Sequence, residues 1–364
     1  MSSFFLELYL AKKDMEILPE LEAFWYDETI RGASTFHLQV STSYWQKWSG
    51  IVTGSDPQDA RLRWGSKVGT SGVWSNWKSV LLYPTRFQHV AGLMTSRVDG
   101  VDAGYRLNES VSNQAFVNQR VSQMVQTLAK MNGFSSRIAE TQGQFTFYQG
   151  RLTDAQFIQQ ELLKCSVSNE GRPDYNFYIE DGKTVVFEPP DLTVNYSTYE
   201  LRNNPINDRG NSISSLDVSM RRFFRGVEEA YATEVRGFDW RLKRPIHLCV
   251  TDGAKGFTYL AKHRPNPPKA PSTIQLTTND TEDQILLEGR ASWGNKARRL
   301  FQGEFEVQDL DVKVTPGKIV TLSVRDPKDQ LYWVSGKWVV WKVRQWFRPR
   351  SQGTRLYLER RSYE

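Results

Sequence analysis

Histidine and cysteine are scarce in this chain. Four of its 364 residues are histidine and two are cysteine, and no two histidines stand three or four positions apart. No Cys-x-x-Cys pair exists either, so the sequence offers no recognisable ligand set for a transition metal. Two cysteines in a chain of this length argue against a disulfide framework and fit a reducing compartment. We therefore predict no metal site and structural roles for His37, His89, His247, His263, Cys165 and Cys249.

Long apolar runs are also missing. No run approaches the roughly 18 apolar residues that a membrane-spanning helix needs. The first apolar run, residues 4–11, carries Glu7 inside it, so it fits a β-strand better than a secretory signal. The sequence predicts no membrane span, no signal peptide and assembly in a cytoplasm.

The motifs of common enzymes are absent as well. The chain has no Gly-x-Ser-x-Gly elbow, and neither cysteine stands in a nucleophile motif. Gly182-Lys183-Thr184 resembles the end of a phosphate-binding loop, but Phe177 occupies the position of the required first glycine. Acidic pairs lie next to one another instead of across a cleft, as glycoside hydrolysis would require; they are Glu180–Asp181, Glu228–Glu229 and Glu282–Asp283. We predict a protein that is not an enzyme, with no catalytic, cofactor-binding or metal-binding residues and no cofactor.

Charge of one sign is not in large excess. The 47 basic and 41 acidic residues give a net charge of +6, which is a weak argument for nucleic acid or membrane binding. Residues 337–361 interleave basic and aromatic side chains, a pattern typical of single-strand nucleic-acid binding. A strand with an aromatic core face and a basic face toward solvent or a partner chain gives the same pattern, and we favour it because charge runs are usually solvated faces.

Tryptophan is abundant, with 12 residues in the chain. These rings could stack on sugars or anchor a protein interface, or they could fill the interior of small β-barrels. A carbohydrate-binding or cell-wall-binding protein is therefore an alternative hypothesis. The tryptophans that crowd the first hundred residues are Trp25, Trp45, Trp48, Trp64, Trp74 and Trp77.

The chain is long enough for two or three domains. Residues 1–104 read as β, with Phe36, Leu38 and Val40 alternating with polar residues and with a hairpin tip over residues 64–72. Residues 105–192 form a small α/β module with a helix over residues 116–128, ended by Gly133, and a strand over residues 145–148. The β pattern returns over residues 193–364.

A capped helix and a hairpin dominate residues 149–190. Thr153 and Gln156 form a capping-box pattern, so a helix should start at Asp154 and bury an apolar face beyond it. Residues 175–179 and 183–187 then alternate as two strands around Asp181-Gly182, which supplies the positive φ angles of a two-residue turn.

The last part of the chain combines one helix with several strands. Thr281 and Gln284 predict a second helix cap, and Gly289 and Gly294 predict that this helix is interrupted or bent. A proline-rich loop is expected over residues 263–271. Strands are expected over residues 215–222, 233–242, 305–307, 312–324, 331–346 and 353–361, with a turn at Pro316-Gly317 in the fourth of them.

The helix, Tyr/Phe strand, Asp-Gly turn and apolar strand of residues 149–190 resemble the phage tail baseplate hub family. That family includes the late-control protein D group, the contractile-tail hub and the hub part of the type VI secretion spike. The C-terminal order also resembles it in segments 296–301, 315–320, 333–340 and 356–360. The resemblance covers about residues 100–364, and residues 1–100 only in general pattern. It implies a mainly β fold with an α+β insert: two β-barrel-like tail-tube domains, residues 1–104 and 193–364, around the module of residues 105–192.

The resemblance also implies a function and partners. The chain would be the central hub of a contractile phage tail or related injection machine, a homotrimer that adapts a sixfold tail tube to a threefold spike. Its partners would be the tail tube protein, the central spike protein, baseplate wedge proteins and the tape measure protein. DNA would pass through the lumen without sequence-specific binding. Its place would be the tail baseplate of the virion, assembled in the host cytoplasm, with the spike supplied by another chain.

Overall fold

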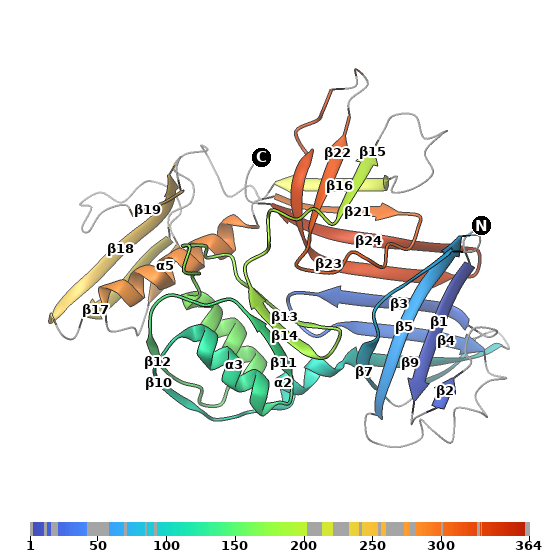
Figure 1. Cartoon of the computed structure of the whole chain (residues 1–364), viewed down its shortest axis with the longest axis horizontal. Coiled ribbons are helices and arrows are strands. Elements are labelled where there is room, and N and C mark those ends of the chain that lie inside the picture. Colours follow the sequence, from blue (N-terminus) through green and yellow to red (C-terminus); the bar gives the residue numbers. More distant parts are fainter. Residues whose placement is uncertain are drawn as a thin grey trace.

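The fold is mainly β, as predicted, with a compact α+β part inserted between two regions of strands (Figure 1). It is seen in a computed structural model that describes residues 3–10, 13–15, 21–41, 58–68, 71–83, 86–90, 93–201, 213–220, 233–239, 242–253, 256–259, 273–276, 281–299, 301–325, 328 and 330–360. None of the helices in these ranges is both long and apolar enough to cross a membrane. The predicted proline-rich loop at residues 263–271 lies outside them.

The N-terminal strands form a curled sheet that we call the first barrel. Its path runs β2-β1-β5-β7-β9-β4-β3 and continues through β3 onto β23, so the last β region closes it. Phe4 of β1 stacks on Phe347 of β23 at 4.3 Å between ring centroids, which brings the two ends of the sheet together. The strands are β1 (Ser3–Leu10), β2 (Lys13–Met15), β3 (Leu21–Thr29), β4 (Thr35–Ser41), β5 (Gln58–Val68), β6 (Ser71–Trp74), β7 (Lys78–Leu82), β8 (Arg86–Val90) and β9 (Leu93–Asp102).

The C-terminal strands form the second barrel in the order β15-β22-β23-β24-β21-β16. Tyr199 of β15 packs on Phe305 of β21 at 4.8 Å between ring centroids, across a core closed by Trp338 and Leu358. The strands are β15 (Ser197–Leu201), β16 (Ile213–Met220), β21 (Phe301–Val307), β22 (Ile319–Val324), β23 (Gly336–Arg348) and β24 (Ser351–Arg360).

Strand β23 belongs to both barrels. Its first half pairs with β22 and its second half, from Lys342 to Phe347, pairs with β3. A bulge between Val340 and Lys342 separates the halves, and bulges bend a strand and increase its twist. One continuous strand therefore ties the two β regions together.

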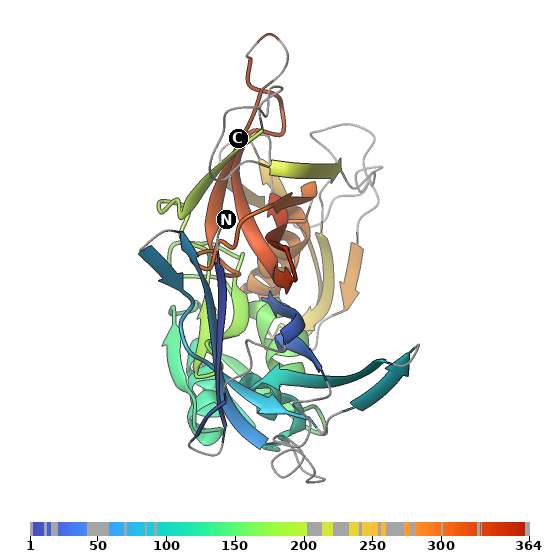
Figure 2. The same cartoon turned by 90° about the vertical axis from the view of Figure 1, so that its right-hand side faces the viewer.

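The module lies between the barrels in sequence and beside them in space, and it is drawn mainly in green in Figure 1. Figure 2 views the molecule from the side of the barrels. Its elements are η3 (Ala103–Tyr105), α2 (Arg106–Glu109), β10 (Ala115–Gln119), α3 (Val121–Met131), β11 (Ser135–Ile138), β12 (Phe145–Tyr148), α4 (Asp154–Phe157), η4 (Ile158–Leu162), η5 (Leu163–Cys165), β13 (Asn176–Glu180) and β14 (Thr184–Glu188). The α3 helix packs against strands β11 and β14, which pair in parallel. The domain boundaries at residues 104 and 192 stay a prediction.

Local signals of the module are confirmed. Thr153 Oγ1 accepts from the backbone N–H of Gln156 at 3.2 Å, and Gln156 Oε1 accepts from the backbone N–H of Thr153. This capping box starts α4 at Asp154, as expected. Phe157 and Ile158 are fully buried. The helix then widens into a π-helix over η4 and narrows to a 3-10 turn over η5, which ends at Cys165.

The helix predicted over residues 116–128 is partly wrong. Phe116 and Val117 lie in β10, where Phe116 pairs with Phe147 of β12, and α3 begins only at Val121. Arg120 donates its amide to Gln123 Oε1 at 3.0 Å and so begins the helix later. The apolar spacing fitted a longer helix, but pairing with β12 decided the structure. Gly133 has φ +75° and ends the helix region as predicted.

A four-stranded sheet and a long helix lie on the far side of the module from the first barrel (Figure 1). The sheet consists of β17 (Thr233–Asp239), β18 (Arg244–Gly253), β19 (Gly256–Tyr259) and β20 (Thr273–Leu276), and the helix is α5 (Glu282–Ala297). Ile285 packs with Val235 of the sheet, while Leu287 and Ala291 join the core of the module.

Two expectations about the C-terminal region are wrong. Helix α5 runs without a break from Glu282 to Ala297, so the interruption expected at Gly289 and Gly294 is wrong. Gly294 instead permits a close approach, since a Cβ there would lie 2.3 Å from Pro173 Cγ. The strand expected from residue 312 begins only at Ile319. The preceding segment instead contributes Leu310 and Val312 to the core of the first barrel and Val314 to that of the second.

Candidate functional site

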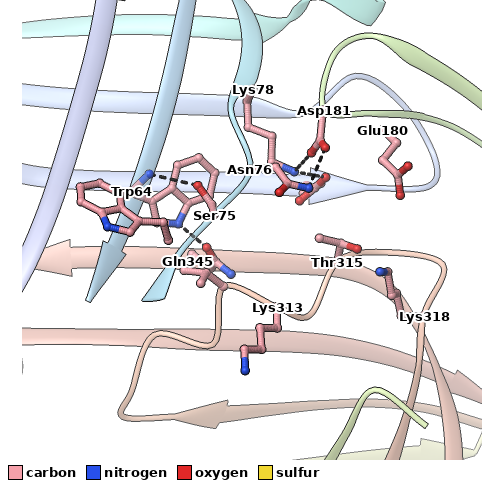
Figure 3. Close-up of a pocket in the computed structure, with 13 residues that line it drawn as sticks. Trp64, Ser75, Asn76, Lys78, Glu180, Asp181, Lys313, Thr315, Lys318 and Gln345 are labelled. Atoms are coloured by element: carbon pink, nitrogen blue, oxygen red, sulfur yellow. Dashed lines mark hydrogen bonds and ion pairs between the residues drawn. The ribbon is translucent and has the colours of Figure 1, made fainter. Parts of the chain in front are cut away.

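A pocket of about 230 Å³ lies where the two barrels and the module meet. Figure 3 shows residues from all three parts around it, drawn as sticks. The first barrel supplies Glu28, Trp64, Trp74, Ser75, Asn76 and Lys78; the module supplies Glu180 and Asp181; the C-terminal region supplies Val312, Lys313, Thr315, Lys318 and Gln345. This junction is the candidate site because buried charges from different parts of the fold meet beside the pocket.

Lys78 is the centre of the junction. Its side chain is almost fully buried, and its Nζ lies 2.8 Å from Glu28 Oε1 and 2.7 Å from Asp181 Oδ1. Burial alone would lower the pKa of Lys78, but the two carboxylates outweigh it and hold the pKa above its usual value, so the amine stays charged. Burial raises the pKa of the Glu28 carboxyl, and the Lys78 charge opposes that rise. The lysine joins β3 and β7 of the first barrel to the hairpin of the module.

The turn of the β13–β14 hairpin reaches Lys78 because Asp181 and Gly182 adopt a left-handed backbone conformation. Asp181 and Gly182 both have positive φ, +55° and +67°, as the sequence predicted. The ladder resumes at Thr184, which pairs with Glu180, so three residues and not two separate the strands. The Ser79 amide donates to the Asp181 carbonyl at 3.0 Å. A Cβ on Gly182 would lie 2.2 Å from the Ser79 carbonyl oxygen, so glycine permits this contact as well as the turn.

The opposite wall joins the first barrel to β23. The Trp64 indole donates to Gln345 Oε1, and Gln345 Nε2 donates to the Asp311 carbonyl at 2.8 Å. The backbone amide of Ser75 donates to the Trp64 carbonyl at 2.8 Å. The buried side chains of Trp64 and Gln345 are therefore hydrogen-bonded within the protein.

A second ionic cluster fastens the shared strand. Arg344 of β23 donates to both carboxylate oxygens of Asp27 on β3 at 2.6 Å, and Lys342 Nζ lies 3.2 Å from the same group. Burial opposes ionisation of Asp27, but Arg344 and Lys342 outweigh it and hold the pKa of Asp27 below its usual value. The bidentate geometry fixes the register between the two barrels.

A third cluster centres on Glu359 of β24, whose side chain is fully buried. Arg31 from the first barrel pairs with it, and Arg298 Nε, after the end of α5, lies 2.5 Å from its Oε1 as an ionic contact without hydrogen-bond alignment. Arg298 also donates to Asn176 Oδ1 of the module at 2.5 Å. This cluster therefore holds both barrels, the module and α5 at one point.

The geometry of the junction supports a role in joining parts of the fold better than a role in catalysis. Glu180 pairs with Arg137 at 2.7 Å, and its neighbour Asp181 pairs with Lys78, so both acids of this predicted pair are engaged in ion pairs. Within the described residues, no group of three or more His, Cys, Asp or Glu side chains is placed to hold a metal ion.

Residues singled out in the sequence fall into different places. His37 pairs with Asp99. Arg63 lies over the rings of Trp74 and Trp77, at 4.7 and 4.5 Å from their centroids. Trp25 packs on His37 at 4.8 Å between ring centroids, and Glu282 pairs with Arg244 at 3.1 Å. Outside the described residues lie Trp45, Trp48, Glu228, Glu229 and His263, and the structure does not describe the side chains of His89, His247 and Cys249.

The C-terminal basic and aromatic stretch has only in part the two-faced form that we favoured, because its buried face carries Trp338 and Val340 before the bulge but Val343 and Gln345 beyond it. Trp338 is 1% exposed in the core of the second barrel, whereas Arg344 points to Asp27. Sequence reasoning did not single out Lys78, Glu28 or Asp27. One signal for Lys78 was a lone lysine at the head of the apolar strand 78–82, although an isolated lysine there usually meets solvent.

Comparison with solved structures finds proteins whose fold is similar to this one over nearly the whole chain. A tail protein from Neisseria meningitidis MC58 superposes with a TM-score of 0.66 at 12% sequence identity, covering 98% of this chain and 96% of its own. The chain has the fold of a phage tail protein. The 43 kDa tail protein of prophage MuSo2 from Shewanella oneidensis shares this tail-protein fold with a TM-score of 0.60 at 12% identity over 98% of both chains.

A protein of an injection machine has the same tail-protein fold. An Escherichia coli component of the type VI secretion system, described as structurally similar to T4 bacteriophage tail proteins, gives a TM-score of 0.55 at 9% identity, over 98% of this chain and 77% of its own. No protein-family model matches the chain, and no curated protein matches it in sequence. At these identities, the likeness establishes the fold of the tail proteins and leaves the function to be proposed.

Proposed function

We propose that this protein is the central hub of the baseplate in a contractile phage tail or a related injection machine, joining the tail tube to the spike. The observation that carries the proposal is the end-to-end likeness to a tail protein, over 98% of this chain and 96% of the other. Both β regions and the inserted module lie within the matched length. A likeness confined to one barrel would have supported only a shared domain.

Symmetry gives the hub its proposed oligomeric state. In the family that the sequence resembles, the tail tube is sixfold and the spike is threefold. A chain with two barrels presents six barrel units when it forms a homotrimer, so it can meet a sixfold ring on one side and a threefold spike on the other. Strand edges left open in one chain would pair with the neighbouring chain, as closed rings of identical subunits allow.

The three ionic clusters support this role. Lys78, Asp27 and Glu359 each join parts of the fold that are distant in sequence, and β23 runs through both barrels. A hub between tube and spike must keep its barrels in a fixed mutual orientation. Buried ion pairs specify such an arrangement by their geometry, since a misplaced partner leaves an uncompensated charge.

The proposal includes partners, location and the absence of enzymatic activity. The hub would bind the tail tube protein, the central spike protein, baseplate wedge proteins and the tape measure protein, and it would line a lumen that DNA crosses without sequence-specific binding. It would lie in the tail baseplate of the virion after assembly in the host cytoplasm. The engaged acids of the junction support a structural role.

A carbohydrate-binding or cell-wall-binding tail protein is less well supported. Sugar binding needs an open aromatic face, and Arg63 already lies over the rings of both Trp74 and Trp77. We expect that Trp74→Ala and wild type give the same signals on a glycan array. A glycan that binds wild type and is lost with this substitution would restore the alternative.

The hub proposal is tested by mass and symmetry. The purified chain is mixed with the spike protein of the same phage or injection machine. The complex is measured by light scattering after size exclusion and imaged by electron microscopy. We expect about three times the 42.0 kDa chain mass, plus the spike, and a ring with a central hole. A monomer at micromolar concentration with the spike present would refute the homotrimer.

A further inference from the structure

Asp102 stands at the joint where the first barrel passes into the module. It is the last residue of β9 and directly precedes η3. The side chain is 2% exposed, its Oδ2 accepts from the Ser34 amide, and its own amide donates to the Ser34 carbonyl at 2.8 Å. Its other carboxylate oxygen, Oδ1, has no well-aligned hydrogen-bond partner. A buried ionised oxygen without a partner is costly, whereas a neutral carboxyl costs much less.

This second carboxylate oxygen, which has no well-aligned partner, lies where the module meets the barrel. A Cβ built on Gly104 would lie 2.6 Å from Asp102 Oδ1 and 2.3 Å from Ile179 Cγ1, so the carboxyl, the glycine backbone and strand β13 are packed together. Ile179 belongs to the hairpin whose turn is held by Lys78 and by the Ser79 amide. Charge on Asp102 therefore acts directly on the contact between barrel and hairpin.

The surrounding charges reinforce this effect. Glu28 on β3 and Asp181 on the hairpin turn are both acidic, and Lys78 on β7 is already paired with both of them. Tyr26 on β3 is buried, and burial together with Glu28 and Asp102 raises its pKa, so it stays neutral. Burial raises the pKa of Asp102 to about 6, against the opposing backbone hydrogen bonds of Ser34 and Gly104, and Glu28 adds to the rise.

We propose that the joint between the first barrel and the β13–β14 hairpin is controlled by a proton on Asp102: it is tight when this carboxyl is neutral and loosens when it ionises. Opening the joint exposes Asp102 to water and returns it to ordinary acidity. The closed joint then binds the proton more tightly than the open one. Its stabilisation is complete below the ordinary Asp pKa of about 3.8 and is lost as pH rises through about 6.

The Ser79 amide reports on the joint, because it donates across it to Asp181. Hydrogen exchange with mass spectrometry is followed at several pH values from 4 to 7.5 in a peptide containing Ser79, and each rate is corrected for intrinsic exchange. The control peptide contains Gly317, whose amide donates to the Val340 carbonyl at 2.8 Å in the second barrel. The variant Asp102→Asn keeps the shape and removes the titration.

We expect protection at Ser79 to fall by up to about 100-fold from pH 4 to 7 in wild type, as a pKa difference of about two units requires, while Gly317 stays constant. In Asp102→Asn the part of this dependence that Asp102 causes should disappear, and only a contribution from Glu28, whose pKa burial also raises, should remain. An unchanged dependence in this variant would overturn the proposal. Constant protection at Ser79 in wild type would overturn the proposal. An equal fall at Ser79 and Gly317 would also overturn it, because the proton would then act on the whole fold. If Asp102→Asn does not fold, the wild-type comparison of the two peptides still decides.

Discussion

Gly182→Ala should be far more damaging than its position in a turn suggests. The residue has φ +67°, so any side chain there is strained by about 1 to 2 kcal/mol. The new Cβ would also lie 2.2 Å from the Ser79 carbonyl oxygen, which belongs to the backbone and cannot rotate away. Forcing atoms into a packed contact costs about 1 to 3 kcal/mol more. We expect a total loss of about 2 to 5 kcal/mol in the free energy of unfolding.

Gly133→Ala is the matched control for this substitution. Gly133 has φ +75°, nearly the same conformation, but a Cβ there would have no atom within 4 Å. It should therefore show the strain alone, about 1 to 2 kcal/mol. Urea denaturation of both variants, analysed with a common slope, gives the difference between them. Equal losses in the two variants would refute the close approach of the hairpin to β7, and with it the joint between barrel and module.

Two further substitutions test the ionic clusters. Lys78→Met should lower the free energy of unfolding by about 3 to 5 kcal/mol, because it leaves Glu28 buried without a counter-charge. Its control is Lys313→Met, at an exposed position of the same pocket, which should change the free energy of unfolding by less than about 0.5 kcal/mol. Similar losses for the two lysines in urea denaturation would contradict the central place of Lys78. Asp27→Asn should destabilise at pH 7, where the lowered pKa of Asp27 contributes to stability, and its deficit should shrink as pH falls from 5 to 3 and wild type loses that contribution. If the loss of stability in Asp27→Asn does not change with pH, the ion pair between Asp27 and Arg344 does not account for that loss.

Local features of the chain followed from neighbouring residues alone. The capping box of Thr153 and Gln156 needs only groups three positions apart, and the turn at Asp181 and Gly182 needs only residues that tolerate positive φ. The alternation of apolar and polar residues likewise predicted which face of β4 is buried. The tail-protein fold was predicted from the resemblance of the segment order to the baseplate hub family.

Long-range pairing was decided by the tertiary structure. Phe116 fits both a helix and a strand, and only its pairing with Phe147 made it a strand. Nothing in the pattern around Lys342 indicates that one half of β23 would pair with β22 and the other with a strand more than 300 residues earlier. Such partners depend on which loops close and which surfaces fit, and neither is written in local periodicity.

The junction was hidden for the same reason. A lysine, a glutamate or an aspartate in a sequence is most often a solvated residue, so Lys78, Glu28 and Asp102 carried no signal of their own. Each is buried in the folded protein, where the hairpin of the module packs against the edge of the first barrel. The sequence by itself determined the local elements and their order. The assembled fold decided which charges would leave water, because burial of a charge depends on every surface that packs around it.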